Sequence, residues 1–273
     1  MTVARLAPAL AVVLAATVLP AAAQEWTGGY VGIYAGVATE PDDDDDRLLF
    51  DTNLDGNFND TVTTATGANA FSPGSCNGVA QGATPAAGCR DNSGGADYGL
   101  RAGYDWQFGQ WVVGAVFDVG RNDVRDAVTS FSTTPANYVA LRKVDTIGAL
   151  RARVGYAFDD VQMLYATAGV ARASIDTSFT SSNTVNTFRE TNDTDADGTQ
   201  FGLGYERRVG TNWSLSAEYL MTMLEDDETR IRAQGPAPAT NPFIRTNPNG
   251  TDFRRSDEDF DFGTFRAALN WRF

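Results

Sequence analysis

The chain has 273 residues and a formal net charge of −14, and it contains no histidine and only two cysteines. Such acidity argues against nucleic acid as a partner, because phosphate backbones attract basic surfaces. The absence of histidine excludes hydrolase mechanisms that need an imidazole base and, with two cysteines, most zinc sites.

The first 23 residues have the pattern of a secretory signal peptide. Arg5 precedes an apolar run over residues 6–19 and three alanines at residues 21–23, as in a leader with a small-residue cleavage site. We therefore expect an exported chain that begins near Gln24. No second apolar stretch approaches the roughly 20 residues of a membrane-spanning helix, which leaves a soluble secreted protein or a transmembrane barrel.

Eight segments of the mature chain alternate apolar and polar side chains with the two-residue period of a strand. In residues 97–108, for example, Tyr98 and Trp106 share one face, whereas Arg101 and Asp105 share the other. The segments average about 13 residues, and a tilted strand needs roughly 9 to 11 to cross a bilayer. In chain order they are residues 27–39, 97–108, 111–120, 143–157, 161–175, 198–209, 213–224 and 259–273.

The connections between these segments alternate between short turns and long loops. The long loops are residues 40–95, 121–142, 176–197 and 225–258. A soluble sandwich has no reason to gather its long loops at one end, whereas an outer-membrane barrel has short periplasmic turns and long extracellular loops. We predict that residues 24–273 form an all-β, eight-stranded, antiparallel up-and-down transmembrane β-barrel in the cell outer membrane.

All five tryptophans fall at the end of the predicted barrel that carries the short turns. They are Trp26, Trp106, Trp111, Trp213 and Trp271. Indole prefers the membrane interface, where its ring is buried and its N–H stays hydrated. This pattern favours an aromatic belt over the alternative, the scattered core aromatics of a soluble sandwich.

If the apolar faces contact lipid, the opposite faces place six arginines and four carboxylates inside the barrel. Eight strands enclose a bore just wide enough for side chains to fill, and a lone buried charge is very costly, so these groups must pair. The arrangement is either a narrow ion path or a satisfied polar core, and the strand number favours the core. The ten residues are Arg101, Asp105, Asp118, Arg151, Arg153, Arg172, Glu206, Arg208, Glu218 and Arg266.

Several strands carry recognisable motifs, among them GLRAGYDWQFG at residues 99–109 and FRAALNWRF at residues 265–273. The other segments are residues 26–32, 151–158, 164–169, 212–215 and 217–220. Together they resemble the opacity-type outer-membrane surface-antigen family of Gram-negative bacteria, often labelled a porin family. The resemblance implies an eight-stranded barrel, surface exposure and a terminal aromatic residue read by the barrel-assembly machinery, which Phe273 matches. It implies no enzyme and leaves channel activity open.

The only two cysteines, Cys76 and Cys89, lie in the first long loop. In an exported protein we expect them to form a disulfide, which restrains the unfolded loop by about 3 kcal/mol in the chain-entropy model. Two free thiols and pairing between chains are the alternatives.

Two loop segments have the oxygen-ligand spacing of a calcium loop. The first comprises Asp51, Asn53, Asp55 and Asn57, and the second comprises Asp193, Asp195 and Asp197. Both lack the closing glutamate, whose positions are taken by Val62 and Gly204. Calcium is therefore a hypothesis, and Asx-type turns are the alternative. Residues 42–46 form an acidic run that is normally solvated and could also hold divalent cations against lipopolysaccharide.

Since loops carry recognition on a rigid scaffold, function is expected there. We predict a non-enzymatic structural or surface-antigen protein whose loops meet lipopolysaccharide or a host or matrix ligand, with no cofactor other than the hypothetical calcium. The alternative is a small-solute porin with a narrow channel. An outer-membrane lipase, acyltransferase or protease is disfavoured, because such barrels rely on histidine.

Overall fold

The computed structural model of the chain describes residues 26–39, 46–191, 195–226 and 229–273. The predicted signal peptide, Asp193 and residues 42–45 of the acidic run lie outside these ranges. Within them, no helix has the length and apolarity of a membrane span.

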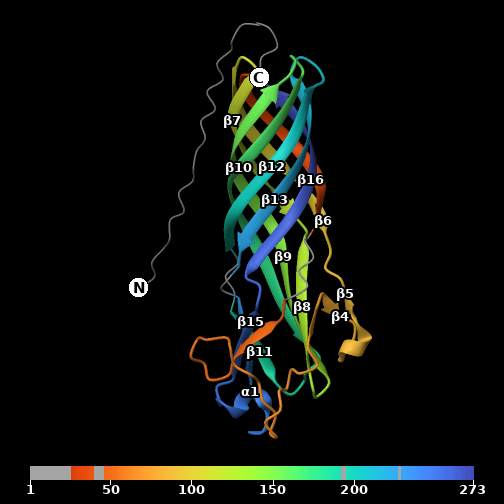
Figure 1. Cartoon of the computed structure of the whole chain (residues 1–273), viewed down its shortest axis with the longest axis vertical. Coiled ribbons are helices and arrows are strands. Elements are labelled where there is room, and N and C mark those ends of the chain that lie inside the picture. The colour runs from red at the N-terminus through yellow and green to blue at the C-terminus, as the bar shows by residue number, and fades with distance from the viewer. Residues whose placement is uncertain (1–25, 40–45, 192–194, 227–228) are drawn as a thin grey trace.

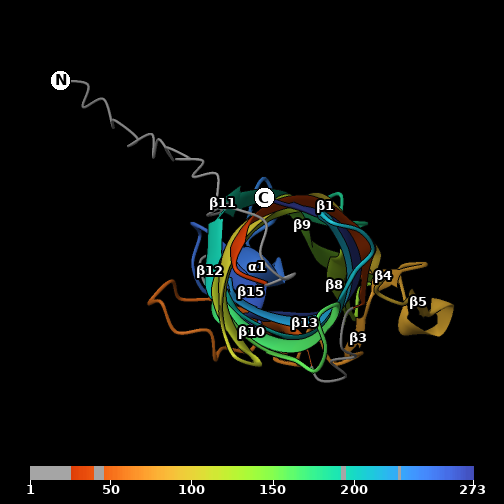
Figure 2. The same cartoon turned by 90° about the horizontal axis from the view of Figure 1, so that it is seen from above.

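Eight long strands pair antiparallel in a circuit (Figures 1 and 2). Their neighbour order is β10-β12-β13-β16-β1-β6-β7-β9, and β9 pairs with β10 again, which returns the circuit to its start. Each forms from one of the eight predicted segments. They are β1 (Gly28–Thr39), β6 (Gly95–Phe108), β7 (Trp111–Asn122), β9 (Ala136–Ala157), β10 (Gln162–Ser181), β12 (Asp195–Arg208), β13 (Trp213–Glu225) and β16 (Asp259–Arg272).

The two-residue period of the sequence separates the two faces of this barrel wall. In β7, Val112, Val116 and Asp118 are buried inside, whereas Val113 and Phe117 point outward and are exposed. Large apolar side chains cover the outside of every one of these strands. The wall therefore has an apolar outer band around a polar interior, as a membrane barrel requires.

Several strands are longer than predicted, because the wall continues beyond the apolar band. β9 begins at Ala136 and β10 runs to Ser181, so both enter segments predicted as loops. A further strand, β8 (Arg125–Ser132), pairs with the added part of β9, and β3 (Ser75–Asn77) pairs with β8. These extensions are stabilised by burial against the aromatic core described next, which local alternation does not reveal.

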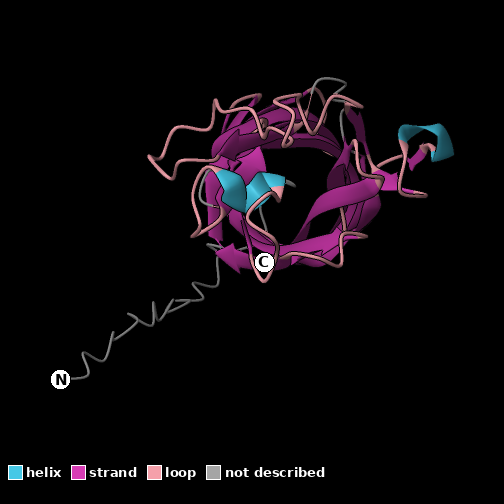
Figure 3. Cartoon of the chain, turned by 90° about the horizontal axis from the view of Figure 1, so that it is seen from below, coloured by secondary structure: helices cyan, strands magenta, loops and turns pink. Residues whose placement is uncertain are grey.

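The long connections fold into an ordered unit that we call the head (Figures 1 and 3). The head comprises residues 46–94, 123–142, 176–191 and 229–258. Its sheet has the order β11-β14-β15-β2 and carries the short helix α1 (Pro242–Arg245). The strands are β2 (Leu48–Asp51), β11 (Thr187–Thr191), β14 (Arg230–Gln234) and β15 (Thr251–Arg255). Seven aromatic rings form its core: Phe50, Phe71, Tyr138, Phe179, Phe188, Phe243 and Phe253.

Part of the head, residues 75–90, forms an arm that stands beside the barrel (Figures 1 and 2). It contains β3, β4 (Val79–Ala80), the 3-10 turn Pro85–Ala87 and β5 (Cys89–Arg90). Cys76 and Cys89 form a disulfide with their Cα atoms 6.5 Å apart, so the predicted pairing is confirmed.

Candidate functional site

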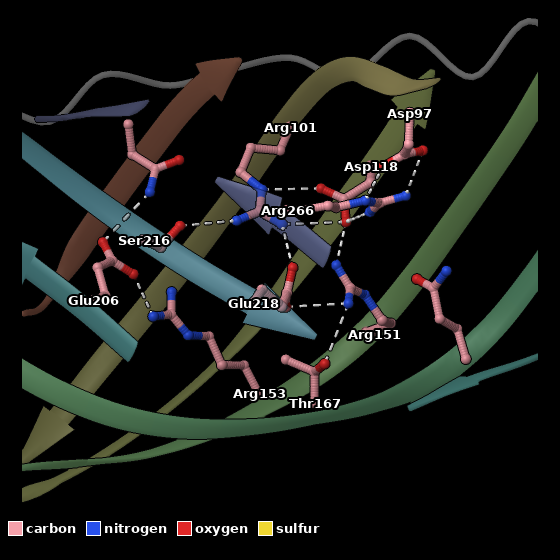
Figure 4. A network of polar contacts seen from close by, with 12 residues as sticks. Asp97, Arg101, Asp118, Arg151, Arg153, Thr167, Glu206, Ser216, Glu218 and Arg266 are labelled. Atoms are coloured by element: carbon pink, nitrogen blue, oxygen red, sulfur yellow. Dashed lines mark hydrogen bonds and ion pairs between the residues drawn. The ribbon is translucent and has the colours of Figure 1, made fainter. Parts of the chain in front are cut away.

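Five charged side chains meet at the centre of the barrel lumen (Figure 4). The Asp118 carboxylate accepts hydrogen bonds from Arg101 (Nε, 3.1 Å), from Arg151 and from Arg266 (Nη1, 3.4 Å). Glu218 accepts from Arg101 (Nη2, 2.8 Å) and Arg151 (Nη1, 3.2 Å). These side chains come from five strands, so the contacts tie opposite walls of the barrel together.

A second layer of charges lies toward the end of the barrel that carries the short turns. Arg272 donates to Asp105 (Nη2 to Oδ2, 2.6 Å) and to Glu206 (Nη1 to Oε1, 3.0 Å). Arg153 pairs with the same two carboxylates, and Ser214 donates its hydroxyl to Glu206 at 2.5 Å. Every carboxylate of this layer is therefore shared between two guanidinium groups.

The ion pair of Asp97 with Arg266 completes what we call the lumen network. None of its members is more than 6% exposed. Five arginines face five carboxylates, so the buried charge is balanced, as burial in a low-dielectric interior requires. The members are Asp97, Arg101, Asp105, Asp118, Arg151, Arg153, Glu206, Glu218, Arg266 and Arg272.

The prediction that Arg172 lies in the lumen is wrong. Its side chain is 63% exposed on the outer wall, where it pairs with Asp195 (2.9 Å) and Asp197 (3.5 Å). In β10 the inward positions share the parity of Tyr165, and Arg172 shares the outward parity of Leu164. The sequence prediction assigned Arg172 to the wrong face of its strand.

The prediction that Trp26 belongs to the aromatic belt is also wrong. Trp26 is completely buried at the turn end of the lumen, with the guanidinium carbons of Arg272 and Arg208 at 5.1 and 5.6 Å from its ring centroid. Arg208 is half-buried and donates to the carbonyl of Thr211 at 3.2 Å. The other four tryptophans are 42–57% exposed on the outside and form the belt. Trp26 instead closes the barrel interior.

Two members of the lumen network, Asp97 and Arg272, were missing from the predicted set. Asp97 shares the parity of Arg101 and Asp105 on β6, and Arg272 shares that of Arg266 on β16. Both lie near the ends of their strands. Continuing the alternation to the strand ends identifies both residues.

A second buried charge group, which we call the junction cluster, joins the head to the barrel. Arg255 of β15 pairs with Asp46 (2.6 Å) and with Asp126 of β8 (2.5 Å), and Arg142 of β9 donates to Asp126 at 2.8 Å. Burial lowers the pKa of the Arg255 guanidinium, but the Asp126 and Asp46 carboxylates outweigh it and raise that pKa. The expectation that the acidic run is solvated is therefore wrong at Asp46, which is 5% exposed.

The first predicted calcium segment forms a set of Asx-type turns. Asp51 is buried and accepts backbone N–H bonds from Leu54 (2.6 Å), Asp55 (3.2 Å) and Gly56 (2.8 Å). The backbone N–H of Asn57 donates to Asp55 and lowers the pKa of that carboxyl. Asn53 also accepts from the Asp55 backbone N–H, at 2.9 Å. The acceptors are thus already occupied by N–H groups of the turn.

The second calcium segment contributes Asp195 and Asp197, both paired with Arg172 on the barrel wall. Among the residues that the structure describes, no three histidine, cysteine or acidic side chains gather in a way that could hold a metal ion. Calcium binding stays a prediction.

Comparison with known proteins places this architecture in a family. Residues 9–273 match the model of the outer membrane protein beta-barrel domain. The chain belongs to this family. It is thus an outer-membrane protein of Gram-negative type, and the predicted localisation is confirmed.

Two curated relatives are the 31 kDa outer-membrane immunogenic proteins of Brucella melitensis biotype 1 and Brucella suis biovar 1. Each is 26% identical over 260 residues, which cover 95% of this chain and 88% of the relative. Among solved structures, OprG from Pseudomonas aeruginosa is 16% identical over 92% of this chain and 99% of its own, with a TM-score of 0.47. Ail of Yersinia pestis is 11% identical over 90% of this chain and 99% of its own, with a TM-score of 0.35.

Proposed function

We propose that this family member is a non-enzymatic surface protein of the opacity type, in which a sealed barrel anchors a head that makes contacts outside the cell. The observation that carries the proposal is the lumen network, because ten buried and mutually paired charges fill the bore. An eight-stranded barrel has no room beside such a filling for a solute path. The sequence predicts no catalytic residue.

The lumen contents support sealing at three levels. Trp26 fills the turn end, the lumen network fills the middle, and the junction cluster lies where the head meets the wall. Opening a path through the middle would separate guanidinium and carboxylate groups that water does not reach. Breaking a buried pair in this way costs about 3 to 5 kcal/mol.

Planar-bilayer recording and liposome swelling with arabinose test the sealed barrel. We expect no reproducible unit conductance and no swelling. Heat-dependent gel mobility of the same proteoliposomes is the control that the protein is folded and inserted. Stable channels of one size would instead support the alternative function, a small-solute porin.

The second part of the proposal is that the head faces the cell exterior and the short turns face the periplasm. The exposed tryptophan belt at the turn end and the long connections at the other end support this orientation. Cysteine labelling of intact cells tests it, because the native cysteines are in a disulfide. A membrane-impermeant maleimide should label Thr66→Cys in the head and spare Asp160→Cys in a turn. Labelling of the turn alone would reverse the orientation.

We propose that lipopolysaccharide contacts two arginines, Arg121 and Arg172, at the edge of the apolar band. Arg121 and Arg172 lie two residues beyond the exposed Val119 and Val170, and the Arg121 guanidinium pairs with Asp145 at 2.5 Å. Guanidinium groups at this level suit lipid phosphates, because charge-assisted bonds to phosphate are strong. The Arg121→Ser, Arg172→Ser double variant should copurify with less lipopolysaccharide than the wild type, and an equal amount would contradict the contact.

Phe273 is proposed as the signal for the barrel-assembly machinery. Its ring is 44% exposed and lies 5.2 Å from that of Trp271, centroid to centroid, while its backbone N–H donates to Gly29. The exposed ring supports recognition by a partner. Phe273→Ser should lower the amount of heat-modifiable protein in the outer membrane, whereas refolding of the purified variant in detergent should be normal.

Calcium binding by the Asp51 turn is part of the proposal as well. Asp51, Asn53, Asp55 and Asn57 carry carboxylate and amide oxygens on alternate residues, which are calcium ligands. A bound ion would replace the N–H groups that now donate to Asp51 and Asp55. Equilibrium dialysis of the refolded protein should show bound calcium at millimolar concentration, and Asp55→Asn should weaken it. No bound ion would exclude this site.

A further inference from the structure

A pocket of about 270 Å³ opens at the tip of the head. Three of its four sides are the β8–β9 turn around Thr134, the segment after β10 around Asn183, and the start of α1 at Pro242. Ala70 and Phe71 supply the fourth side. Figure 1 shows α1 at the end of the molecule opposite the C-terminus, so the pocket lies far from the tryptophan belt.

Three aromatic side chains in mutual contact line the pocket. The ring centroids of Phe71 and Tyr138 are 5.0 Å apart, those of Tyr138 and Phe243 are 5.6 Å apart, and those of Phe71 and Phe243 are 5.9 Å apart. Pro135 and Pro242 add apolar surface beside them. This side of the pocket is rigid and apolar, because the rings belong to the aromatic core of the head.

Fixed amide groups line another side of the pocket. Asn183 donates its Nδ2 to the Tyr138 hydroxyl at 3.0 Å. The Asn241 Nδ2 donates to the side-chain Oδ1 of Asn186 at 3.0 Å, and the Asn186 Nδ2 donates to the Asn241 Oδ1 at 3.2 Å. These bonds hold the amides in place before any ligand arrives, so little side-chain entropy is lost on binding.

The pocket is uncharged in a strongly charged protein. The chain carries 35 acidic and 21 basic residues, yet none of the described residues that line the pocket is acidic or basic. Three exposed threonines, Thr133, Thr134 and Thr184, place hydroxyl groups around it. A matching ligand is neutral, with one apolar face and a hydrogen-bonding edge.

We propose that this pocket binds a neutral sugar ring of a glycan, which deepens the proposed surface function and rests on it. A pyranose has C–H groups on one face, which suit the negative face of an aromatic ring, and hydroxyl groups along its edge, which suit amides and hydroxyls. Drug-sized sites measure roughly 300 to 1,000 Å³, so this smaller pocket suits one or two rings. The glycan belongs to a host or matrix surface or to a bacterial polysaccharide.

Calorimetric titration of the whole mature protein, in a zwitterionic detergent without a sugar headgroup, tests the proposal. The probes are glucose, galactose, mannose, N-acetylglucosamine and their β-1,4-linked dimers, with glucuronic acid as a charged comparison. We expect saturable binding of a neutral sugar with a dissociation constant on the order of 1 mM, as suits a ligand this small. Purified bacterial lipopolysaccharide and a desialylated host glycoprotein, each used as a competitor of the preferred sugar, then distinguish the bacterial from the host source.

Filling the pocket gives the matched variants. Thr184→Trp should weaken binding by about 10-fold or more, whereas Thr66→Trp, in an exposed part of the head outside the pocket, should leave it unchanged. Both proteins should keep the heat-dependent gel mobility of the wild type. Retained affinity in Thr184→Trp would move the sugar to another site and overturn the assignment.

Two further results in the titration would overturn the proposal: no saturable binding of any neutral sugar, or a preference for glucuronic acid. A third is binding of neutral proline-containing peptides that is weakened by Thr184→Trp, because this would make the pocket a peptide site. If bilayer recordings show no channels and the head is labelled on intact cells, the proposed surface function still holds. Failure of the sugar proposal can therefore be distinguished from failure of the proposed function.

Discussion

The lumen network and the junction cluster solve the same problem in two different environments. Both pair buried guanidinium groups with buried carboxylates, but Arg151 of the lumen network is completely buried, whereas the side chain of Arg255 in the junction cluster is 12% exposed. The lumen network holds the walls of one barrel together, while the junction cluster connects two units, the barrel and the head. The comparison indicates that the free-energy cost of removing one partner of a buried ion pair depends on how far water reaches the other partner. The structural consequence of the removal depends on which parts of the protein the pair connects.

The largest expected effect is that of Asp118→Ala, because this carboxylate is shared by three arginines of the lumen network. Its loss leaves buried positive charge without a partner, so we expect the free energy of unfolding to fall by about 3 to 5 kcal/mol. Urea titration in micelles, followed by heat-dependent gel mobility, measures this. Asp160→Ala, in an exposed turn, is the matched control. A loss below about 1 kcal/mol would mean that water reaches the lumen.

Asp126→Ala tests the junction cluster and should have a smaller effect, since water can hydrate part of Arg255. We expect a loss of about 1 to 3 kcal/mol, confined to the attachment of the head. Limited proteolysis should cut residues 229–258 faster, while the unfolding midpoint of the barrel changes little. Asp123→Ala removes an exposed pair with Lys143 and serves as the control. Equal destabilisation of head and barrel would show that the two units unfold together.

Arg172→Ala contrasts the outside of the wall with the inside. Its pairs with Asp195 and Asp197 are exposed, so we expect a change of about 0 to 1 kcal/mol, which falls further in high salt. Arg151→Ala, on the neighbouring strand β9 and inside the barrel, should cost about 3 to 5 kcal/mol. Comparable losses in the free energy of unfolding of the two variants would contradict the placement of Arg172 on the outer wall.

Removal of the disulfide should have the smallest effect on the barrel. The Cys76→Ser, Cys89→Ser double variant frees an arm that stands beside the wall, and the chain-entropy model assigns about 3 kcal/mol to that loop alone. We expect faster hydrogen exchange in residues 75–90 and an unchanged urea midpoint for the barrel. A lower midpoint would show that the arm supports β8.

The success of the sequence interpretation follows the same division between barrel and head. The barrel strands and most of the lumen network were predicted, because a strand in lipid must alternate at every second residue and a charge such as Arg101 then marks the interior. Arg172 was misplaced because a strand assigned to the wrong parity exchanges its two faces. Trp26 was misassigned because it precedes the first strand, where alternation no longer indicates direction.

The head could not be predicted in the same way. Its strands have two to five residues outside the extensions of the barrel, and its core joins Phe50, Tyr138 and Phe253 across large distances in sequence. No local period connects such residues. Asp46 shows the consequence, since in sequence it belongs to an acidic run and in the structure it pairs with Arg255 more than 200 residues away.

The sequence by itself determined the barrel, its apolar outer band, the charged interior and the disulfide, because the two-residue period and an export signal are local properties of the chain. Only the tertiary structure decided that the loops form a head, that Trp26 closes the lumen, and that an uncharged aromatic pocket lies at the tip. These features depend on contacts between segments distant in sequence, whose pairing is chosen by packing and charge neutralisation in three dimensions.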